Sequence, residues 1–186
     1  MGIEMSELNK KLSLEELNRL SIEEFKATQK NPIILVLDDI RSMNNVGSAF
    51  RTADAFACEE ICLVGITAKP PHREISKTAL GADESVNWSY YENAASCLAY
   101  LKEKGYQIIS VEQVEKPVYL QNFHAEKDEK FAFVFGNEVF GVNDEFIAHS
   151  KQCIEIPQFG TKHSLNVSVT MGIIVWDILS KIKFQY

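Results

Sequence analysis

Residues 33–37 read Ile-Ile-Leu-Val-Leu, an apolar run with no polar residue inside it. A strand with one face in water alternates apolar and polar side chains, whereas a strand buried on both faces can be apolar throughout. Similar short runs recur at residues 61–64, 108–111, 131–135 and 153–156. The sequence therefore predicts a sheet with both faces covered.

Apolar residues with helical spacing fill the intervals between these runs. They predict helices around residues 46–57, 94–101, 142–147 and 167–182, and the last of these is apolar on most sides. Strands that alternate with helices are typical of parallel sheets. We therefore expect an α/β fold with a mostly parallel sheet flanked by helices.

Residues 1–30 form a segment with a different pattern, ahead of the domain expected over residues 31–186. A rough helical stripe of leucines lies among Glu, Lys and Asn, and two Ser-x-x-Glu sequences, beginning at Ser13 and Ser21, are typical of capping boxes. Five basic and six acidic residues give this segment a charge of −1. We expect a helical appendage that lies on the domain and is not a basic arm; the alternative is a role in gripping RNA.

The chain of 186 residues has a net charge of −7. Domains that bind nucleic acid are usually basic, so composition alone favours an enzyme for small molecules, although a local basic patch can still bind RNA. No apolar run reaches the roughly 20 residues that span a bilayer, and the N-terminus lacks a secretory pattern. We expect a cytoplasmic protein with no membrane contact, whose four cysteines are reduced.

Three polar segments follow predicted strands, where the ligands of open α/β sheets bind. The first motif segment, residues 44–51, contains Asn45 near a predicted helix start, with Gly47 and Arg51 one helical turn apart. Helix N-termini attract anions such as phosphate. An ordinary Asn cap followed by a solvent-facing Arg would give the same pattern.

The second and third motif segments combine glycines with polar side chains. The second, residues 135–142, has Gly136 and Gly141 around an acid, which indicates either a backbone loop that a ligand approaches closely or a plain tight turn. It matches neither the Gly-x-Gly-x-x-Gly pattern nor the phosphate loop. The third, residues 156–168, passes from a strand end through a glycine loop to Ser164 or Asn166 as the cap of the final helix.

Together the three segments resemble the SpoU (TrmH-like) branch of the SPOUT RNA methyltransferases, over residues 32–183. The family sequence Asn-x-Gly-x-x-x-Arg is matched from Asn45 to Arg51, and Gly-x-Glu-x-x-Gly from Gly136 to Gly141. The third segment matches throughout, and so does the Thr-Ala-Leu-Gly-Ala run from Thr78.

The resemblance implies a C-terminal deep trefoil knot that binds S-adenosylmethionine and forms a homodimer interface, so that each active site draws on both subunits. It implies transfer of a methyl group to a ribose 2'-hydroxyl of tRNA or rRNA, without DNA and without metal. The cofactor-binding residues that it implies are Gly136, Ile156 and Leu165, which act through their backbone, and Gly141 and Gly160. The catalytic residues that it implies are Arg51, Asn45, Glu138, Ser164 and Asn166.

A guanidinium with a pKa above about 12 is a poor general base. We therefore expect Arg51 to hold a phosphate with two hydrogen bonds and Glu138 to orient Arg51, with the general base unassigned. For RNA, the candidates are Lys69, His72, Arg73, Lys77 and Lys162, whose alternative is a solvated surface. Two other functions stay open: a non-catalytic RNA-binding relative, and a small-molecule methyltransferase or nucleotide-binding protein.

Overall fold

The computed structural model describes residues 10–13 and 16–184, which form one seven-stranded sheet. Its strands are β1 (Asn31–Asp38), β2 (Cys58–Val64), β3 (Trp88–Tyr91), β4 (Gln107–Val111), β5 (Val118–Tyr119), β6 (Phe131–Phe135) and β7 (Gln152–Glu155). All neighbouring strands run parallel, in the order β3-β2-β1-β6-β4-β7-β5. The predicted α/β class is confirmed, and the sheet is parallel throughout.

Two strands, β3 and β5, have no counterpart among the predicted ones. They lie at the two edges of the sheet, where β3 reads Trp-Ser-Tyr-Tyr and is only partly buried, and β5 has two residues. Apolar runs arise from burial on both faces, so edge strands of this kind give no such signal. The last predicted strand is one residue too long, because β7 ends before Ile156.

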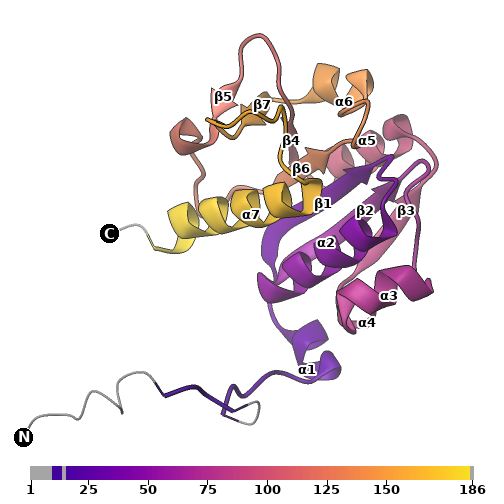
Figure 1. Cartoon of the computed structure of the whole chain (residues 1–186), viewed down its shortest axis with the longest axis vertical. Coiled ribbons are helices and arrows are strands. Elements are labelled where there is room, and N and C mark those ends of the chain that lie inside the picture. The colour runs from indigo at the N-terminus through magenta and orange to yellow at the C-terminus, as the bar shows by residue number, and fades with distance from the viewer. Residues whose placement is uncertain (1–9, 14–15, 185–186) are drawn as a thin grey trace, which may run out of the picture.

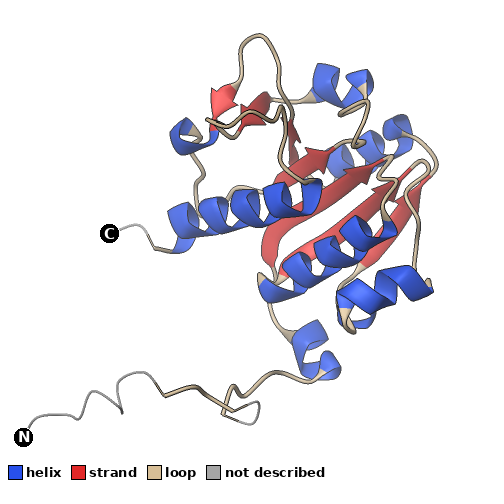
Figure 2. Cartoon of the chain, viewed as in Figure 1, coloured by secondary structure: helices blue, strands red, loops and turns tan. Residues whose placement is uncertain are grey.

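The sheet separates two apolar layers, as the fully apolar sequence of β1 predicts. Ile33, Leu35 and Leu37 point into one layer, and Ile34 and Val36 into the other. The first layer is closed by α2 (Met43–Ala55), α3 (Arg73–Ala79), α4 (Ala82–Ser85) and α7 (Val167–Lys183). The second is closed by α5 (Ala94–Glu103) and α6 (Asp144–His149), on the far side in Figures 1 and 2. A 3-10 turn, η1, covers Leu120–Asn122.

The four predicted helices exist, with bounds set by their caps. Ser42 caps α2, because its hydroxyl accepts a hydrogen bond from the backbone N–H of Asn45 at 3.3 Å. Asn45 therefore lies inside the first turn, and the alternative of an Asn cap at that position is wrong. The helix predicted from Val142 begins later, at Asp144, because Asn143 caps α6. No helix of the described ranges is long and apolar enough to cross a membrane.

Gly47 of the first motif segment allows α2 and α3 to pack closely. A Cβ atom at this position would lie 2.0 Å from the hydroxyl of Thr78 and 2.4 Å from the carbonyl oxygen of Ile75. Any side chain would therefore push the two helices apart. Close helix packing explains Gly47 and the Thr78 and Ala79 positions of the Thr-Ala-Leu-Gly-Ala run.

The N-terminal segment forms less helix than its sequence pattern predicts. The capping box of Ser21 and Glu24 is present at the start of α1 (Ile22–Ala27), whose Phe25 packs into the first apolar layer. Ser13 and Glu16 exchange the hydrogen bonds of a capping box without a following helix. Residues 16–20 are not helical, so the helix predicted from the leucine stripe is wrong over these residues. Leu14 lies outside the described residues. In a short helix exposed to water, the free-energy cost of ordering the backbone exceeds the stabilisation from its few hydrogen bonds.

The order of the strands changes direction between β1 and β6. From β1 the chain builds β2 and β3 on one side, then crosses over and builds β4 to β7 on the other. In open α/β sheets, ligands bind at the carboxyl ends of the strands near such a switch point. The second motif segment begins at the end of β6, and the first lies in α2, the helix that follows β1.

Candidate active site

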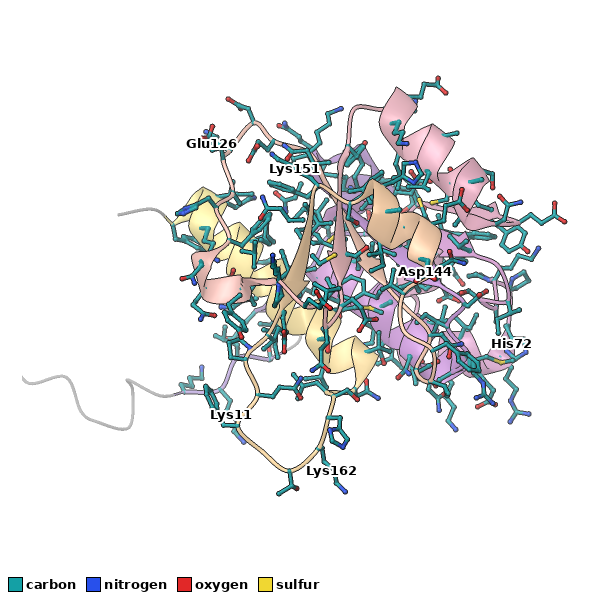
Figure 3. The ribbon with its side chains drawn as sticks, turned by 90° about the horizontal axis from the view of Figure 1, so that it is seen from above. Lys11, His72, Glu126, Asp144, Lys151 and Lys162 are labelled. Atoms are coloured by element: carbon teal, nitrogen blue, oxygen red, sulfur yellow. The ribbon has the colours of Figure 1, made fainter. Side chains whose placement is uncertain are left out.

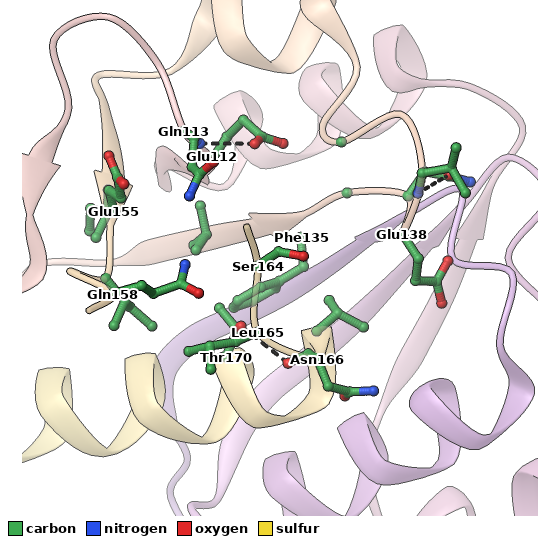
Figure 4. A pocket seen from close by; sticks show the side chains of 18 residues that line it. Glu112, Gln113, Phe135, Glu138, Glu155, Gln158, Ser164, Leu165, Asn166 and Thr170 are labelled. Carbon is green, nitrogen blue, oxygen red and sulfur yellow. Dashed lines mark hydrogen bonds between the residues drawn. The ribbon is translucent and has the colours of Figure 1, made fainter. Parts of the chain in front are cut away.

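A cavity of about 470 Å³ lies at the carboxyl ends of β4, β6 and β7 (Figure 4). Val111, Phe135 and Glu155, the last residues of these three strands, form part of its wall. The second and third motif segments form much of the remainder. The cavity has the size of a typical ligand site in proteins, which is roughly 300–1,000 Å³.

The second motif segment closes on itself at the edge of this cavity. The backbone groups of Asn137 and Gly141 exchange two hydrogen bonds of 2.9 Å. A Cβ atom at Gly136 would lie 2.2 Å from the backbone of both Gly141 and Val142, and Gly141 has a φ of +74°. Both glycines line the cavity and both are required by the loop itself. The tight turn is therefore confirmed, and its position in the cavity wall leaves the approach of a ligand as a prediction.

Side chains from all three motif segments are joined by hydrogen bonds beside the cavity. Asn45 donates its Nδ2 hydrogen to Oε1 of Glu138, with 2.9 Å between the two atoms. Asn166 donates from Nδ2 to Oδ1 of Asn45 at 3.3 Å, across 121 positions of sequence. Asn166 also caps α7, because its Oδ1 accepts from the backbone N–H of Ser168 at 2.8 Å. The fold thus brings Asn45, Glu138 and Asn166 together, as the resemblance implies.

Glu138 is held by the start of α2. Its carboxylate accepts hydrogen bonds from the backbone N–H groups of Arg41 at 3.0 Å and Ser42 at 3.2 Å, besides the one from Asn45. Partial burial of the carboxylate opposes ionisation, but these hydrogen bonds outweigh burial and lower the pKa of Glu138. Glu138 is therefore an anion at the N-terminus of α2, where the helix dipole favours one.

Arg51 lies apart from this cluster. Its side chain is exposed, it does not line the cavity, and within residues 10–13 and 16–184 it has no hydrogen-bond or ion-pair partner. Six residues separate it from Asn45, which is about 9 Å along a helix. The expectation that Glu138 orients Arg51 is wrong for this chain alone, because the carboxylate is occupied at the opposite end of α2.

The third motif segment contributes one wall of the cavity and one exposed loop. Ile156, Ser164 and Leu165 line the cavity together with Asn166. Gly160 is not among the lining residues, and a Cβ atom there would meet nothing within 4 Å. Of the five implied cofactor residues, the structure gathers four around the cavity and leaves Gly160 in the solvent-exposed loop.

Four of the five candidate RNA contacts lie in or beside α3. The ammonium of Lys69 stacks on the ring of Tyr90, 3.8 Å from its centre. His72 caps α3, where its Nδ1 accepts from the backbone N–H of Glu74 at 3.2 Å, and Arg73 is the first residue of the helix. Lys77 forms an exposed ion pair with Glu74, with 3.9 Å between the charged atoms.

Lys162, the fifth candidate, does not join this group. It lies on the exposed loop of the third motif segment, whereas the other four lie in or beside α3; Figure 3 labels Lys162 on this loop. The candidate basic residues therefore come from two different segments of the chain.

Four polar residues of the cavity wall lie outside the three motif segments: Thr170 of α7, and Glu112, Gln113 and Glu155 at the ends of strands. Glu112 and Gln113 directly follow β4, and Glu155 ends β7. Their position at the carboxyl ends of strands is a signal that a systematic search for polar residues after each apolar run would have detected. Glu112, Gln113 and Glu155 lie outside the glycine-rich segments, so the family motifs do not include them.

Buried polar and thiol groups elsewhere have structural roles. Burial of Asp38 raises the pKa of its carboxyl group to about 6, even though the carboxylate accepts a hydrogen bond from the backbone N–H of Asn143 at 2.7 Å. Cys58, Cys62 and Cys97 are free and buried. No group of three or more metal-binding side chains occurs within the part of the chain that the structure describes. The expected independence of metal stays a prediction.

Comparison with known proteins links this site to a family. Residues 32–176 match the model of the SpoU rRNA Methylase family. The 23S rRNA (guanosine-2'-O-)-methyltransferase RlmB of Neisseria meningitidis is 34% identical over 145 residues, which is 77% of this chain and 56% of that protein. The tRNA (guanosine(18)-2'-O)-methyltransferase of Borreliella burgdorferi is 26% identical over 162 residues, which is 87% of this chain and 72% of that protein.

Solved structures have the same fold. The TrmH/SpoU tRNA modifying enzyme of A. aeolicus superposes with a TM-score of 0.75 at 23% identity, and 86% of this chain matches 80% of that one. The AdoMet-bound rRNA methyltransferase of Sinorhizobium meliloti also gives a TM-score of 0.75, at 24% identity, over 83% of this chain and 59% of that one. The chain thus spans little more than half the length of some of the proteins that it matches.

Proposed function

Because the chain belongs to the SpoU rRNA methylase family, we propose that it is an RNA methyltransferase that modifies a ribose 2'-hydroxyl of tRNA or rRNA. One observation carries the proposal: the side chains of Asn45, Glu138 and Asn166, from three distant motif segments, are hydrogen-bonded to one another beside a ligand-sized cavity. The two relatives described above are both named as guanosine 2'-O-methyltransferases, one of rRNA and one of tRNA.

The cavity is the proposed site of S-adenosylmethionine. Gly136, Ile156 and Leu165 line it and offer backbone groups to an adenosine, and Gly141 adds a residue without a side chain. The rRNA methyltransferase of S. meliloti, which has the same fold, is described as AdoMet-bound. Gly160 is left out of the proposed cofactor site, because it does not line the cavity.

The chemistry requires an aligned hydroxyl and a path for its proton. When bound, S-adenosylmethionine would supply a methyl group from its sulfonium, and the ribose oxygen would take that methyl carbon as the carbon–sulfur bond broke with its electrons left on sulfur. Asn45, Asn166 and Ser164 offer neutral polar groups that position the 2'-hydroxyl. The three hydrogen bonds that the Glu138 carboxylate accepts favour its anionic form. They also tie the second motif segment to the start of α2, so this carboxylate has a structural role. The general base stays unassigned.

The proposed partner of each subunit is a second copy of the chain. Val169, Ile173 and Trp176 form an apolar stripe on α7, with exposed fractions of 51%, 36% and 54%. An apolar stripe at this spacing on one helix is typical of a helix interface. A dimer through α7 and a C-terminal trefoil knot would also let Arg51, which is outside its own chain's cavity, serve the partner's site.

The dimer is tested by its mass. We expect light scattering at micromolar concentration to give twice the chain mass of 21.0 kDa, and Trp176→Glu to give a monomer, because a charge cannot be buried in an apolar interface. Lys183→Glu, at the end of the same helix, is the control that should leave the dimer intact. A wild-type monomer would contradict the proposal.

RNA contacts are assigned to the surface around α3. Lys69, His72, Arg73 and Lys77 lie on or beside α3, which packs on α2 next to the first motif segment. Lys162 would contact RNA separately, from its exposed loop. We propose the domain as residues 31–186 with an appendage over 1–30, in the cytoplasm, where tRNA and rRNA occur.

The test of this function is the loss of a modification. We expect total tRNA and rRNA from a strain lacking the gene to miss one 2'-O-methyl group, and the purified protein to restore it with S-adenosylmethionine as donor. Restoration by the wild type but not by Asn166→Ala would tie the activity to this site. A strain with an unchanged set of 2'-O-methyl groups would instead favour a non-catalytic RNA-binding relative.

A further inference from the structure

The cavity is strongly acidic. Three carboxylates line it, those of Glu112, Glu138 and Glu155, and none of the described residues that line it is Lys, Arg or His. A cavity that bound only neutral or anionic groups would gain nothing from three carboxylates, and each would cost desolvation. The wall therefore has the charge of a site for a cation.

Glu112 is the carboxylate whose place is fixed most directly at the cofactor loop. Its Oε2 accepts from the backbone N–H of Val142 and its Oε1 from that of Gln113, both at 2.8 Å. A Cβ atom at Gly141 would lie 2.3 Å from this carboxylate, so the motif glycine leaves room for it. These two hydrogen bonds hold the carboxylate of Glu112 against the second motif segment.

The negative charge of Glu112 affects the ionisation of a neighbouring thiol. Burial, followed by the charge of Glu112, raises the pKa of the neighbouring Cys153 thiol. Glu138, by contrast, has its carboxylate taken up by three donors at the start of α2. Figure 4 shows Glu112 and Glu155 on the side of the cavity opposite Asn166, away from the cluster around the proposed hydroxyl site.

We propose that Glu112 is a specificity-determining residue that makes the cavity prefer the methyl donor to the spent cofactor. The inference rests on the proposed function. S-adenosylmethionine carries a sulfonium, an ammonium and a carboxylate, a net charge of +1, whereas S-adenosylhomocysteine has lost the sulfonium charge and is neutral. The two are otherwise almost the same shape. A cavity walled by fixed anions separates them by charge, so the product leaves and the donor replaces it.

The size of this effect follows from Coulomb's law. A carboxylate about 8 Å from a unit positive charge contributes between a few-fold and about 30-fold in affinity as the effective dielectric constant falls from that of water to about 20. We therefore expect the wild type to bind the donor roughly tenfold more tightly than the product, with about a threefold preference left when one of the carboxylates is neutralised. Added salt should reduce the preference, because the cavity is open to solvent on one side.

The experiment is calorimetry on the full chain with three ligands. S-adenosylmethionine and sinefungin, in which a protonated amine replaces the methylsulfonium, carry the extra positive charge, and S-adenosylhomocysteine does not. The variants are Glu112→Gln, which keeps the shape and an oxygen for the Val142 N–H, and Glu115→Gln, a control for an exposed acid that does not line the cavity. Glu112→Gln should weaken both cationic ligands about threefold and leave S-adenosylhomocysteine unchanged, while Glu115→Gln should match the wild type.

Two results would overturn the inference. Equal affinity of the wild type for all three ligands would show that the cavity does not distinguish ligands by their net charge. Equal weakening of all three by Glu112→Gln would show that Glu112 only supports the loop. In both cases the proposed function would stand. If the wild type bound none of the three ligands, the proposed function itself would fail, and this inference with it.

Discussion

Gly136→Ala is expected to reduce methylation by at least about 100-fold and to weaken cofactor binding severely, whereas Gly160→Ala should leave both near wild type. Both glycines are among the cofactor residues that the family resemblance implies, but only Gly136 lines the cavity, and their surroundings differ. A Cβ atom at Gly136 would lie 2.2 Å from backbone atoms of Gly141 and Val142, and backbone cannot rotate away as a side chain can. At Gly160 a Cβ atom meets nothing within 4 Å, and its φ is not in the left-handed region.

The loop that Gly136→Ala would displace carries Glu138 and lines the cavity, so the cofactor wall and the anchor of α2 should move together. Calorimetry with S-adenosylhomocysteine and a methylation assay measure the two effects, and circular dichroism with thermal melting checks that the variant is folded. A folded Gly136→Ala protein with the cofactor affinity of Gly160→Ala would show that the cavity of this loop is not the cofactor site.

Much of the fold can be predicted because buried strands leave a clear apolar pattern in the sequence. The run Ile33 to Leu37 has no polar position because both faces of β1 are covered, and each of its side chains lies in one of two apolar layers. Edge strands do not follow this rule. The strand Trp88–Tyr91 pairs with β2 on one side only and is partly buried, so its sequence resembles that of a half-exposed segment. Residues 16–20 show the converse, since a helical spacing of leucines forms no helix there without a surface to bury them.

The site is predictable to the extent that it is local in sequence. Asn45, Glu138 and Asn166 stand in recognisable short motifs, but their hydrogen bonds join positions 93 and 121 residues apart, which only the crossover of the chain brings together. Glu112 belongs to no motif, because its role depends on a backbone N–H of Val142, 30 residues away. Arg51 lies six residues beyond Asn45 along α2, exposed and outside the cavity, and the spacing of a motif does not state where the cavity lies.

Arg51→Lys is expected to lose most of the methylation rate, roughly 100-fold, while cofactor affinity is unchanged. Lysine keeps the positive charge but cannot hold a phosphate with two parallel hydrogen bonds. Arg51 does not line the cavity, so neither Arg51→Lys nor the more severe Arg51→Ala should alter cofactor binding. Single-turnover methylation and cofactor titration measure the two effects, with Arg19→Lys in the N-terminal segment as the matched exchange. Near-normal turnover in Arg51→Lys would eliminate the phosphate clamp.

Where Arg51 acts can be decided by mixing two inactive variants. In a two-fold dimer, an Arg51→Ala subunit keeps an intact cavity, and a Gly136→Ala subunit keeps an intact Arg51. If Arg51 serves the partner's cavity, each mixed dimer regains one complete site, and an equal mixture should recover about a quarter of wild-type activity. If Arg51 serves its own chain, every site in the mixture lacks one of the two residues, and the mixture stays inactive. The exposed position of Arg51, outside its own cavity and without a partner among the described residues, favours recovery.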